Sequence, residues 1–341
     1  MKAMVLRAPR ELVLDDVARP GLDPSRVLVR VTHSGVCGTD FKIYSGAIPV
    51  NYPRIMGHEM VGEVVEAGDL EDHPTVRRGD TVIIDPELYC GACFHCRIGQ
   101  THLCPKGMLV GRDTNGGFAD YVTAPASHVF RLPDSIDSRT APLIQVLTTC
   151  LHAQRQVNIF PAESVVVFGL GVTGQLHVQL AKARGASPVI GVTRSAEKRA
   201  LAEKLGADLT IPGGEGAIEK VRAATEGRGV DLVIETTGVL PSVATAVAMA
   251  RSGGRLLLFG IITAKEGALP FYDLYFKELA LISARVAKSE DYPSSLALVQ
   301  HGTVRLEPLV SDVMPLGELR TAITMLGSDS AKRMKIILDH Q

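Results

Sequence analysis

The sequence predicts an α/β protein in which a β-rich N-terminal domain precedes a doubly wound parallel sheet. Up to about residue 140, short alternating segments such as VLVRVTHSGVC and DTVIID are separated by Gly and Pro, the pattern of strands joined by loops. From about residue 165, continuous apolar runs alternate with helical segments, as in parallel strands covered on both faces. A chain of 341 residues also exceeds the size at which a single hydrophobic core stops growing.

The second half of the chain repeats one order, strand then helix. Helical segments separate five strand-like runs: SVVVFGLG, SPVIGVT, DLTI, VDLVIETTG and GRLLLFG. We therefore expect residues 147–286 to form the doubly wound domain. Residues 1–146 should form the other domain. The separate helices and strands of 287–341 should pack back onto that first domain.

The composition argues against several functional classes. Lys and Arg number 36 and Asp and Glu number 37, and a net charge of −1 offers no electrostatic footprint for nucleic acid or an anionic membrane. No apolar run approaches the roughly 18–20 residues of a membrane-spanning helix. The first residues, MKAMVLRAPRELVL, alternate like a strand and show no targeting peptide, so we expect a cytoplasmic protein.

Four of the six cysteines fall in the stretch CGACFHCRIGQTHLC, with the spacing of a metal site. They are Cys90, Cys93, Cys96 and Cys104. Two C-x-x-C steps that share a cysteine, followed by a fourth thiol, can surround one Zn²⁺, and such a closed shell makes the zinc structural. So few cysteines disfavour a disulfide framework. Because four thiolates complete the shell, we interpret His95 and His102 as loop residues of this lobe.

A glycine-rich turn follows the first apolar run. Gly169, Gly171 and Gly174 form G-x-G-x-x-G between a predicted strand and a predicted helix. This context predicts a dinucleotide site in which backbone and helix N-terminus meet the pyrophosphate. The further candidate cofactor-binding residues are Val172, Thr193, Arg194, Thr237 and Gly260.

The end of the second strand bears on the choice of cofactor. An acidic side chain there would bind the ribose 2′-OH of NAD(H), whereas a nearby Arg suits a 2′-phosphate. This sequence has Thr193 at that position and Arg194 next, with Lys198 and Arg199 downstream. We therefore expect NADP(H) to be favoured over NAD(H). The alternative is that these basic residues are only the solvated start of a helix.

A second metal site is indicated by three residues in the first domain. Cys37 lies in the glycine-flanked loop GVCGTD, and His58 and Glu59 lie in MGHEMVG at the start of another strand. Singly, such residues are more often packing than chemistry. Together they suggest a thiolate, an imidazole and a carboxylate around a zinc that keeps a position open for substrate.

With these motifs in view, the chain resembles the zinc-containing medium-chain alcohol and polyol dehydrogenases. GVCGTD, GHEMVGEV, the four-cysteine lobe, GGFADY, GLGVTG and VIETTG occur in the family's order over essentially the whole length. CGTDFKIY and RTHLC are most similar to the branch with threonine, sorbitol and sugar dehydrogenases. The resemblance implies a GroES-like first domain, a Rossmann second domain and reversible hydride transfer between NAD(P) and a secondary alcohol, polyol or sugar. It also implies two zinc ions per subunit and a homodimer or homotetramer.

The resemblance also implies roles for single residues. Cys37 and His58 match the first two ligands of the catalytic zinc, and Glu59 matches an acid that binds the zinc or lies just behind it. Thr39 matches the hydroxyl that passes the substrate proton outward. The third protein ligand, usually Cys or Glu, falls at Gln145, where this sequence departs from the pattern. Three alternatives follow: Gln145 binds zinc, Glu59 replaces it while Gln145 orients water, or the zinc is loosely held.

Two further residues complete the interpretation. Lys42 stands where many relatives have a proton-relaying His, so the relay should depend more on Thr39, the cofactor ribose and water. Cys150 is expected to be a core residue. The competing functions are a zinc-free quinone or enone reductase, which leaves the metal-type residues unexplained, and a nucleotide-binding redox sensor, which only Gln145 supports.

Overall fold

The computed structural model describes residues 1–68, 76–327 and 333–341, and the chain forms two compact units. The first unit comprises Met1–Thr148, Lys288–Gly302 and Leu306–Gln341. The second comprises Thr149–Ala287 and Thr303–Arg305. The first unit is therefore built from both ends of the chain.

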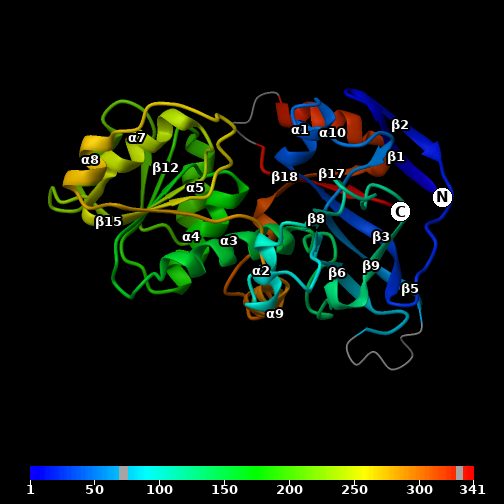
Figure 1. The fold of residues 1–341 in the computed structure, drawn as a ribbon. Helices are drawn as coiled ribbons and strands as arrows, with labels where there is room; N and C mark the ends of the chain where they lie inside the picture. The colour runs from blue at the N-terminus through cyan, green and yellow to red at the C-terminus, as the bar shows by residue number, and fades with distance from the viewer. Residues whose placement is uncertain (69–75, 328–332) are drawn as a thin grey trace. The chain divides into compact units, whose positions relative to one another are not determined.

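A seven-stranded sheet forms the centre of the first unit. Its order is β10-β6-β5-β3-β18-β17, and β9 also pairs with β3. These strands are β3 (Arg26–Val36), β5 (Glu59–Ala67), β6 (Thr81–Ile84), β9 (Tyr121–Pro125), β10 (Val129–Arg131), β17 (Val310–Pro315) and β18 (Lys335–Asp339). Strand β18, red in Figure 1, lies antiparallel beside the blue β3, with Ile336 opposite Val36. The last strand of the chain is thus an interior strand of this sheet.

Smaller sheets and short helices complete the first unit. The order β2-β1-β4 forms one small sheet and β7-β8 another. Their strands are β1 (Lys2–Ala8), β2 (Glu11–Asp16), β4 (Arg54–Ile55), β7 (Glu87–Leu88) and β8 (Met108–Leu109). The helices are α1 (Gly38–Tyr44), α2 (Phe94–Arg97), α9 (Tyr292–Gln300) and α10 (Leu319–Gly327), and α3 (Leu143–Val157) continues into the second unit.

The second unit contains a six-stranded sheet in which all neighbours are parallel. Its order is β13-β12-β11-β14-β15-β16. The strands are β11 (Val165–Phe168), β12 (Val189–Thr193), β13 (Leu209–Pro212), β14 (Val230–Glu235), β15 (Ala250–Leu258) and β16 (Ala280–Ser283). The order reverses between β11 and β14, where doubly wound folds bind ligands. The predicted fold class is confirmed.

Helices cover both faces of this sheet, which explains its apolar strands (Figure 1). Val165 and Val167 belong to one buried cluster and Val166 to another, so successive residues of β11 enter different cores. The helices are α4 (Val172–Ala183), α5 (Ala196–Lys204), α6 (Ala217–Ala223), α7 (Leu240–Met249) and α8 (Phe271–Phe276). Within the described ranges, we find no helix with the length and apolar character needed to traverse a bilayer.

Candidate active site

Two neighbouring strands bring the three predicted ligands of the second metal site together. Cys37 follows β3, and Glu59 begins the adjacent β5 directly after His58. The register places Gly35 opposite Glu59, and a Cβ at Gly35 would lie 2.1 Å from Glu59 Oε2. The ligand atoms of Cys37, His58 and Glu59 all lie within 4.8 Å of one another. The absence of a side chain at Gly35 therefore lets the carboxylate reach this cluster.

Asp40 connects two members of the cluster from behind. Its carboxyl is fully buried, and Oδ2 accepts a hydrogen bond from the Cys37 backbone N–H at 2.9 Å. Oδ1 lies 3.5 Å from His58 Nδ1. Burial alone lowers the pKa of His58, but the Asp40 carboxylate outweighs burial and holds this pKa well above its usual range. Asp40 thus favours an imidazole that keeps its proton on Nδ1.

Lys335 supplies the counter-charge of Glu59. Its Nζ lies 2.8 Å from both Oε1 and Oε2 and donates to the Val36 carbonyl at 3.3 Å. Both side chains are almost completely buried. Although burial lowers the pKa of Lys335, the Glu59 carboxylate raises it above its ordinary value overall. The two oxygens of Glu59 therefore already share one cationic partner.

The donor set of this cluster fits a zinc ion. Thiolate, imidazole and carboxylate are ligands that Zn²⁺ accepts, and three protein ligands leave a position for substrate. His58 Nδ1 and Asp40 Oδ1 are buried and have no well-formed hydrogen bond among the described residues. An imidazole that binds a metal through Nε2 directs its Nδ1–H to such a carboxylate. The arrangement around His58 therefore suits a metal ligand.

The remaining predicted residues lie on two helices. Thr39 and Lys42 are half-buried on α1, and neither side chain has a hydrogen bond or ion pair within the described ranges. The Thr39 hydroxyl is therefore available to an incoming group. Gln145 lies in the first turn of α3 and is 7% exposed. Cys150 is fully buried further along α3, which confirms its interpretation as a core residue.

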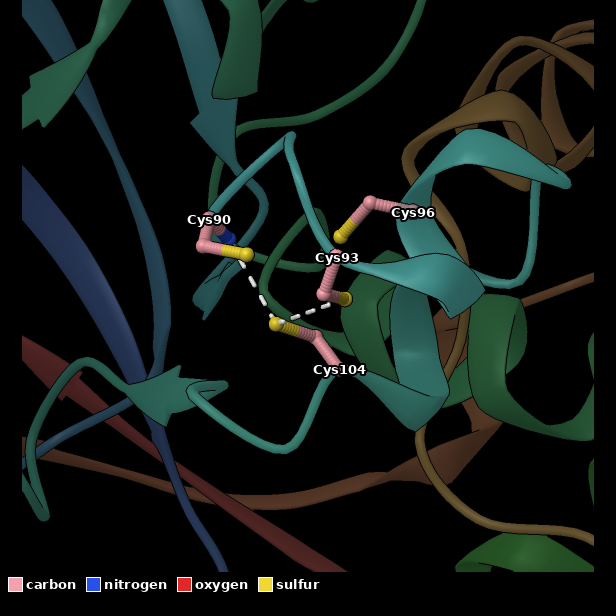
Figure 2. Close-up of side chains that lie close together, drawn as sticks. All are labelled: Cys90, Cys93, Cys96 and Cys104. Atoms are coloured by element: carbon pink, nitrogen blue, oxygen red, sulfur yellow. Dashed lines mark hydrogen bonds between the residues drawn. The ribbon is translucent and has the colours of Figure 1, made fainter.

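The four-cysteine lobe forms the second cluster, and Figure 2 shows its thiols turned toward one another. Cys93 is the N-cap of α2, Cys96 lies within this helix, and Cys104 follows a short 3₁₀ turn. The four ligand atoms lie within 4.8 Å of one another, and the Sγ atoms of Cys93 and Cys104 are 3.9 Å apart. A tetrahedron with Zn–S bonds of about 2.3 Å has edges of roughly 3.8 Å. This spacing suits a shared zinc and is too long for a disulfide.

The thiols of the lobe differ in how readily they ionise. Backbone N–H groups of Ala92 and Cys93 lower the pKa of Cys90 to about 6. Burial and the neighbouring thiols raise the pKa of Cys96 to about 12. Four adjacent thiols cannot all ionise unless a cation compensates the charge. His95 and His102 are not members of the cluster, as predicted, but the loop interpretation is wrong: His95 lies in α2 and His102 in the 3₁₀ turn Thr101–Leu103.

The segment that leads into the lobe is fixed by a buried carboxyl group, Asp85. Oδ1 accepts from the Glu87 N–H at 3.0 Å, and Oδ2 accepts from Ser289 Oγ at 2.5 Å. Burial raises the pKa of Asp85 to about 6 although both hydrogen bonds lower it. The fold thus favours the protonated acid. The contribution of Asp85 to the free energy of unfolding therefore falls as pH rises from about 4 to about 6 and is then constant.

We expect Asp85→Asn to remove this pH dependence. Between pH 5 and pH 7 the wild-type free energy of unfolding should fall by about 1 kcal/mol relative to the variant. Urea unfolding at both pH values measures the difference. Asp134→Asn is the control, because the Asp134 side chain is 93% exposed. A wild-type-to-variant difference that is equal at both pH values would contradict the prediction.

The glycine-rich turn leaves room for a ligand. A Cβ at Gly174 would lie 2.0 Å from the Gly169 carbonyl oxygen, so only glycine allows this close approach of helix and turn. A Cβ at Gly171 would meet nothing within 4 Å. Gly171 is the N-cap of α4, whose first helical residue is Val172. The open space in front of this helix end is where a pyrophosphate would fit.

The other candidate cofactor residues follow the carboxyl ends of parallel strands. Thr193 ends β12 and Arg194 follows it, while Thr237 and Gly260 each lie two residues beyond the end of β14 and β15. Because the strands are parallel, these ends lie along the same edge of the sheet as the glycine-rich turn. Glu235 is buried there and accepts hydrogen bonds from Thr237 and Ser242, which orders the loop after β14.

Two residues that contact the metal cluster, Asp40 and Lys335, were missed in the sequence. Asp40 had a local signal in C-G-T-D. Cys37 immediately precedes the helix and Asp40 lies three residues later, which is the spacing of a capping box. Lys335 had a weaker signal, a lysine in the otherwise apolar strand KIILD. Nothing local pairs that lysine with Glu59.

Comparison with known proteins identifies the family. An alcohol dehydrogenase GroES-like domain matches residues 23–134, and a zinc-binding dehydrogenase domain matches residues 172–301. L-threonine 3-dehydrogenase of Pyrococcus abyssi is 36% identical over 309 residues, 88% of this chain and 87% of that protein. The chain belongs to the zinc-binding medium-chain alcohol dehydrogenases.

Other relatives agree with this dehydrogenase family. D-arabitol-phosphate dehydrogenase of Enterococcus avium is 30% identical over 329 residues, 94% of this chain and 93% of that protein. A zinc-binding dehydrogenase of Sinorhizobium meliloti 1021 bound to NADP superposes with a TM-score of 0.92 at 31% identity, over 99% of this chain and 98% of that one. The protein is therefore an NAD(P)-dependent dehydrogenase, and the zinc-free reductase and the redox sensor are not favoured.

Proposed function

We propose that this dehydrogenase transfers a hydride between a nicotinamide dinucleotide and a secondary alcohol, polyol or sugar, with Cys37 and His58 as zinc ligands. The observation that supports this most is the meeting of Cys37, His58 and Glu59 within 4.8 Å. Asp40 and Lys335 behind them supply the orientation and charge that a catalytic metal site needs.

Thr39 is the residue we propose for proton transfer. Its hydroxyl is unengaged among the described side chains, so it can accept the proton of the substrate O–H while donating its own outward. When bound, zinc would supply Lewis-acid polarisation of the substrate oxygen and the nicotinamide would accept the hydride. Cys37, His58 and Asp40 hold the geometry around this exchange.

For the third zinc ligand we propose Gln145, with Glu59 behind the metal. Both Glu59 oxygens contact Lys335 Nζ, which favours a position behind the metal over direct ligation for this carboxylate. The neutral amide oxygen of Gln145 is a weaker ligand than a carboxylate. Equilibrium dialysis of Gln145→Ala tests the assignment, since an unchanged zinc affinity at this site would contradict it.

We propose two zinc ions per subunit and a preference for NADP(H). The lobe of Cys90, Cys93, Cys96 and Cys104 would hold the structural ion. For the cofactor, Arg194 is exposed and has no ion pair within the described ranges, so its guanidinium is available to a 2′-phosphate.

The cofactor preference has a direct test. We expect kcat/KM with NADP to exceed that with NAD by about tenfold or more, the size of one charge-assisted hydrogen bond to phosphate. Steady-state kinetics at a saturating alcohol concentration measures the ratio. A higher value with NAD would contradict the preference without affecting the proposed chemistry.

We propose a homodimer or homotetramer as the assembly. Helix α8 has no buried residue, and its aromatic side chains Phe271, Tyr272, Tyr275 and Phe276 are 63–77% exposed. The neighbouring β16 is an edge strand of the sheet. Exposed aromatic patches beside an open edge are typical of subunit contacts. A single species near 36.4 kDa in sedimentation velocity would contradict this assembly.

An activity panel tests the proposed function as a whole. Polyols, sugars and simple secondary alcohols are offered with each cofactor, and the reverse reaction is offered the corresponding ketones. We expect turnover with at least one class, and loss of turnover when the catalytic metal is removed by a chelator and recovery when Zn²⁺ is returned. Chelator-resistant turnover would contradict a zinc-dependent reaction.

A further inference from the structure

We infer that Gln175 and Arg199 are positioning residues for the cofactor, because their side chains tie together the two loops that a dinucleotide has to contact. The first loop is the glycine-rich turn after β11, and the second is the loop after β12 that carries Arg194. The inference depends on the proposed cofactor site and assigns it two residues outside the glycine motif.

Gln175 connects the glycine-rich turn to the start of α5. It is fully buried in the first turn of α4. Its Nε2 donates to the Leu170 carbonyl at 3.3 Å and to the Lys198 carbonyl at 2.8 Å. Leu170 lies between the first two glycines of the motif, and Lys198 lies in the first turn of α5. Both amide hydrogens are therefore used to hold two separate backbone segments.

Arg199 continues this connection to the second loop. Its Nη1 donates to the Thr193 carbonyl at 2.9 Å and to the Arg194 carbonyl at 2.8 Å. The guanidinium thus holds the backbone on which Arg194 stands. Because Lys198 and Arg199 are adjacent, the two tethers form one path from the glycine-rich turn through α5 to the loop after β12.

The two arginines consequently have different roles. Arg194 keeps its guanidinium exposed and unengaged within the described ranges, so it is available to contact the adenosine end of the cofactor. The Arg199 guanidinium donates to backbone carbonyls instead, so it affects the cofactor only by positioning Thr193 and Arg194. A cofactor that binds both loops gains affinity when their spacing is fixed beforehand, because less ordering occurs on binding.

Gln175→Leu tests the hydrogen bonds of Gln175 to the Leu170 and Lys198 carbonyls, and Gln179→Leu is its matched control. Gln179 lies one turn further along α4, is also buried, and exchanges two hydrogen bonds with the Arg305 backbone, at 3.1 Å and 2.8 Å. Both variants should lose similar thermal stability. We expect Gln175→Leu to raise the Kd of NADPH roughly tenfold with kcat at saturating cofactor unchanged, and Gln179→Leu to change Kd less than about twofold. Fluorescence titration measures Kd.

The arginine variants test the contacts of Arg199 with the Thr193 and Arg194 carbonyls, and they do so even if Gln175→Leu does not fold. Arg199→Gln should raise the Kd of both NADPH and NADH, because the whole loop is loosened, while Arg194→Gln should raise only that of NADPH. Equal effects of Gln175→Leu and Gln179→Leu, or no effect of Arg199→Gln on either cofactor, would overturn the inference. Tighter wild-type binding of NADH would refute the NADP preference alone, since the tethers should then still affect NADH.

Discussion

Replacing Cys37 by Ser is expected to lower kcat/KM for alcohol oxidation by at least about 10³-fold, because a Lewis acid supplies several kcal/mol of transition-state stabilisation. Ser is isosteric with Cys but is a poor zinc ligand at neutral pH. The wild type should contain two zinc ions per subunit and the variant one, with NADPH affinity and thermal unfolding nearly unchanged. Metal analysis and steady-state kinetics on the same preparation measure both effects.

Cys150→Ser is the control for this substitution. Cys150 undergoes the same chemical change but lies in the core of α3, outside both metal clusters. It should keep two zinc ions and most of its activity. If Cys37→Ser retained full activity with one zinc, the metal at Cys37 would not be catalytic and the proposed function would be wrong.

Replacing Lys335 by Met is expected to have the largest effect on stability. Met fills a similar volume, but the Glu59 carboxylate is left buried without its counter-ion. Breaking one side of a buried pair typically costs about 3–5 kcal/mol. Urea unfolding of the zinc-loaded protein should therefore show a loss of this size in the free energy of unfolding of the first unit.

Two comparisons make this prediction specific. Lys335→Met combined with Glu59→Gln should recover much of the stability, because the uncompensated charge is gone. Lys2→Met should change stability by less than about 1 kcal/mol, since the Lys2–Asp16 ion pair is solvent-exposed. A double variant as unstable as the single one would show that lost packing, rather than the charge, is responsible.

Local patterns in the sequence predicted the parallel sheet and both clusters of metal-type residues. Two of these features depend only on residues close together in the sequence: the strand–turn–helix around Gly169 and the cysteine spacing of the lobe. Such local patterns can be recognised without knowing the fold. Cys37 and His58 were predicted to share a site from the motifs GVCGTD and MGHEMVG. The pairing of β3 with β5 explains why the two residues meet.

The partners behind the cluster could not be predicted in the same way. Lys335 reaches Glu59 across 276 positions of the chain, and only the pairing of β18 with β3 brings them together. The tethers of Gln175 and Arg199 were equally hidden, because each side chain binds backbone carbonyls. Backbone acceptors have no residue-specific signature in a sequence.

The interior position of β18 has a consequence for biosynthesis. On the ribosome, most of the second unit (Thr149–Ala287) is complete about fifty residues before Lys335–Asp339 are translated. Until then, residues His33–Val36 of β3 lack a neighbour on one side, and Glu59 lacks the Lys335 cation. Nascent chains therefore expose an unpaired strand edge, the kind of surface that invites aggregation. Loss of the codons for Lys335–Asp339 would make this vulnerable state permanent.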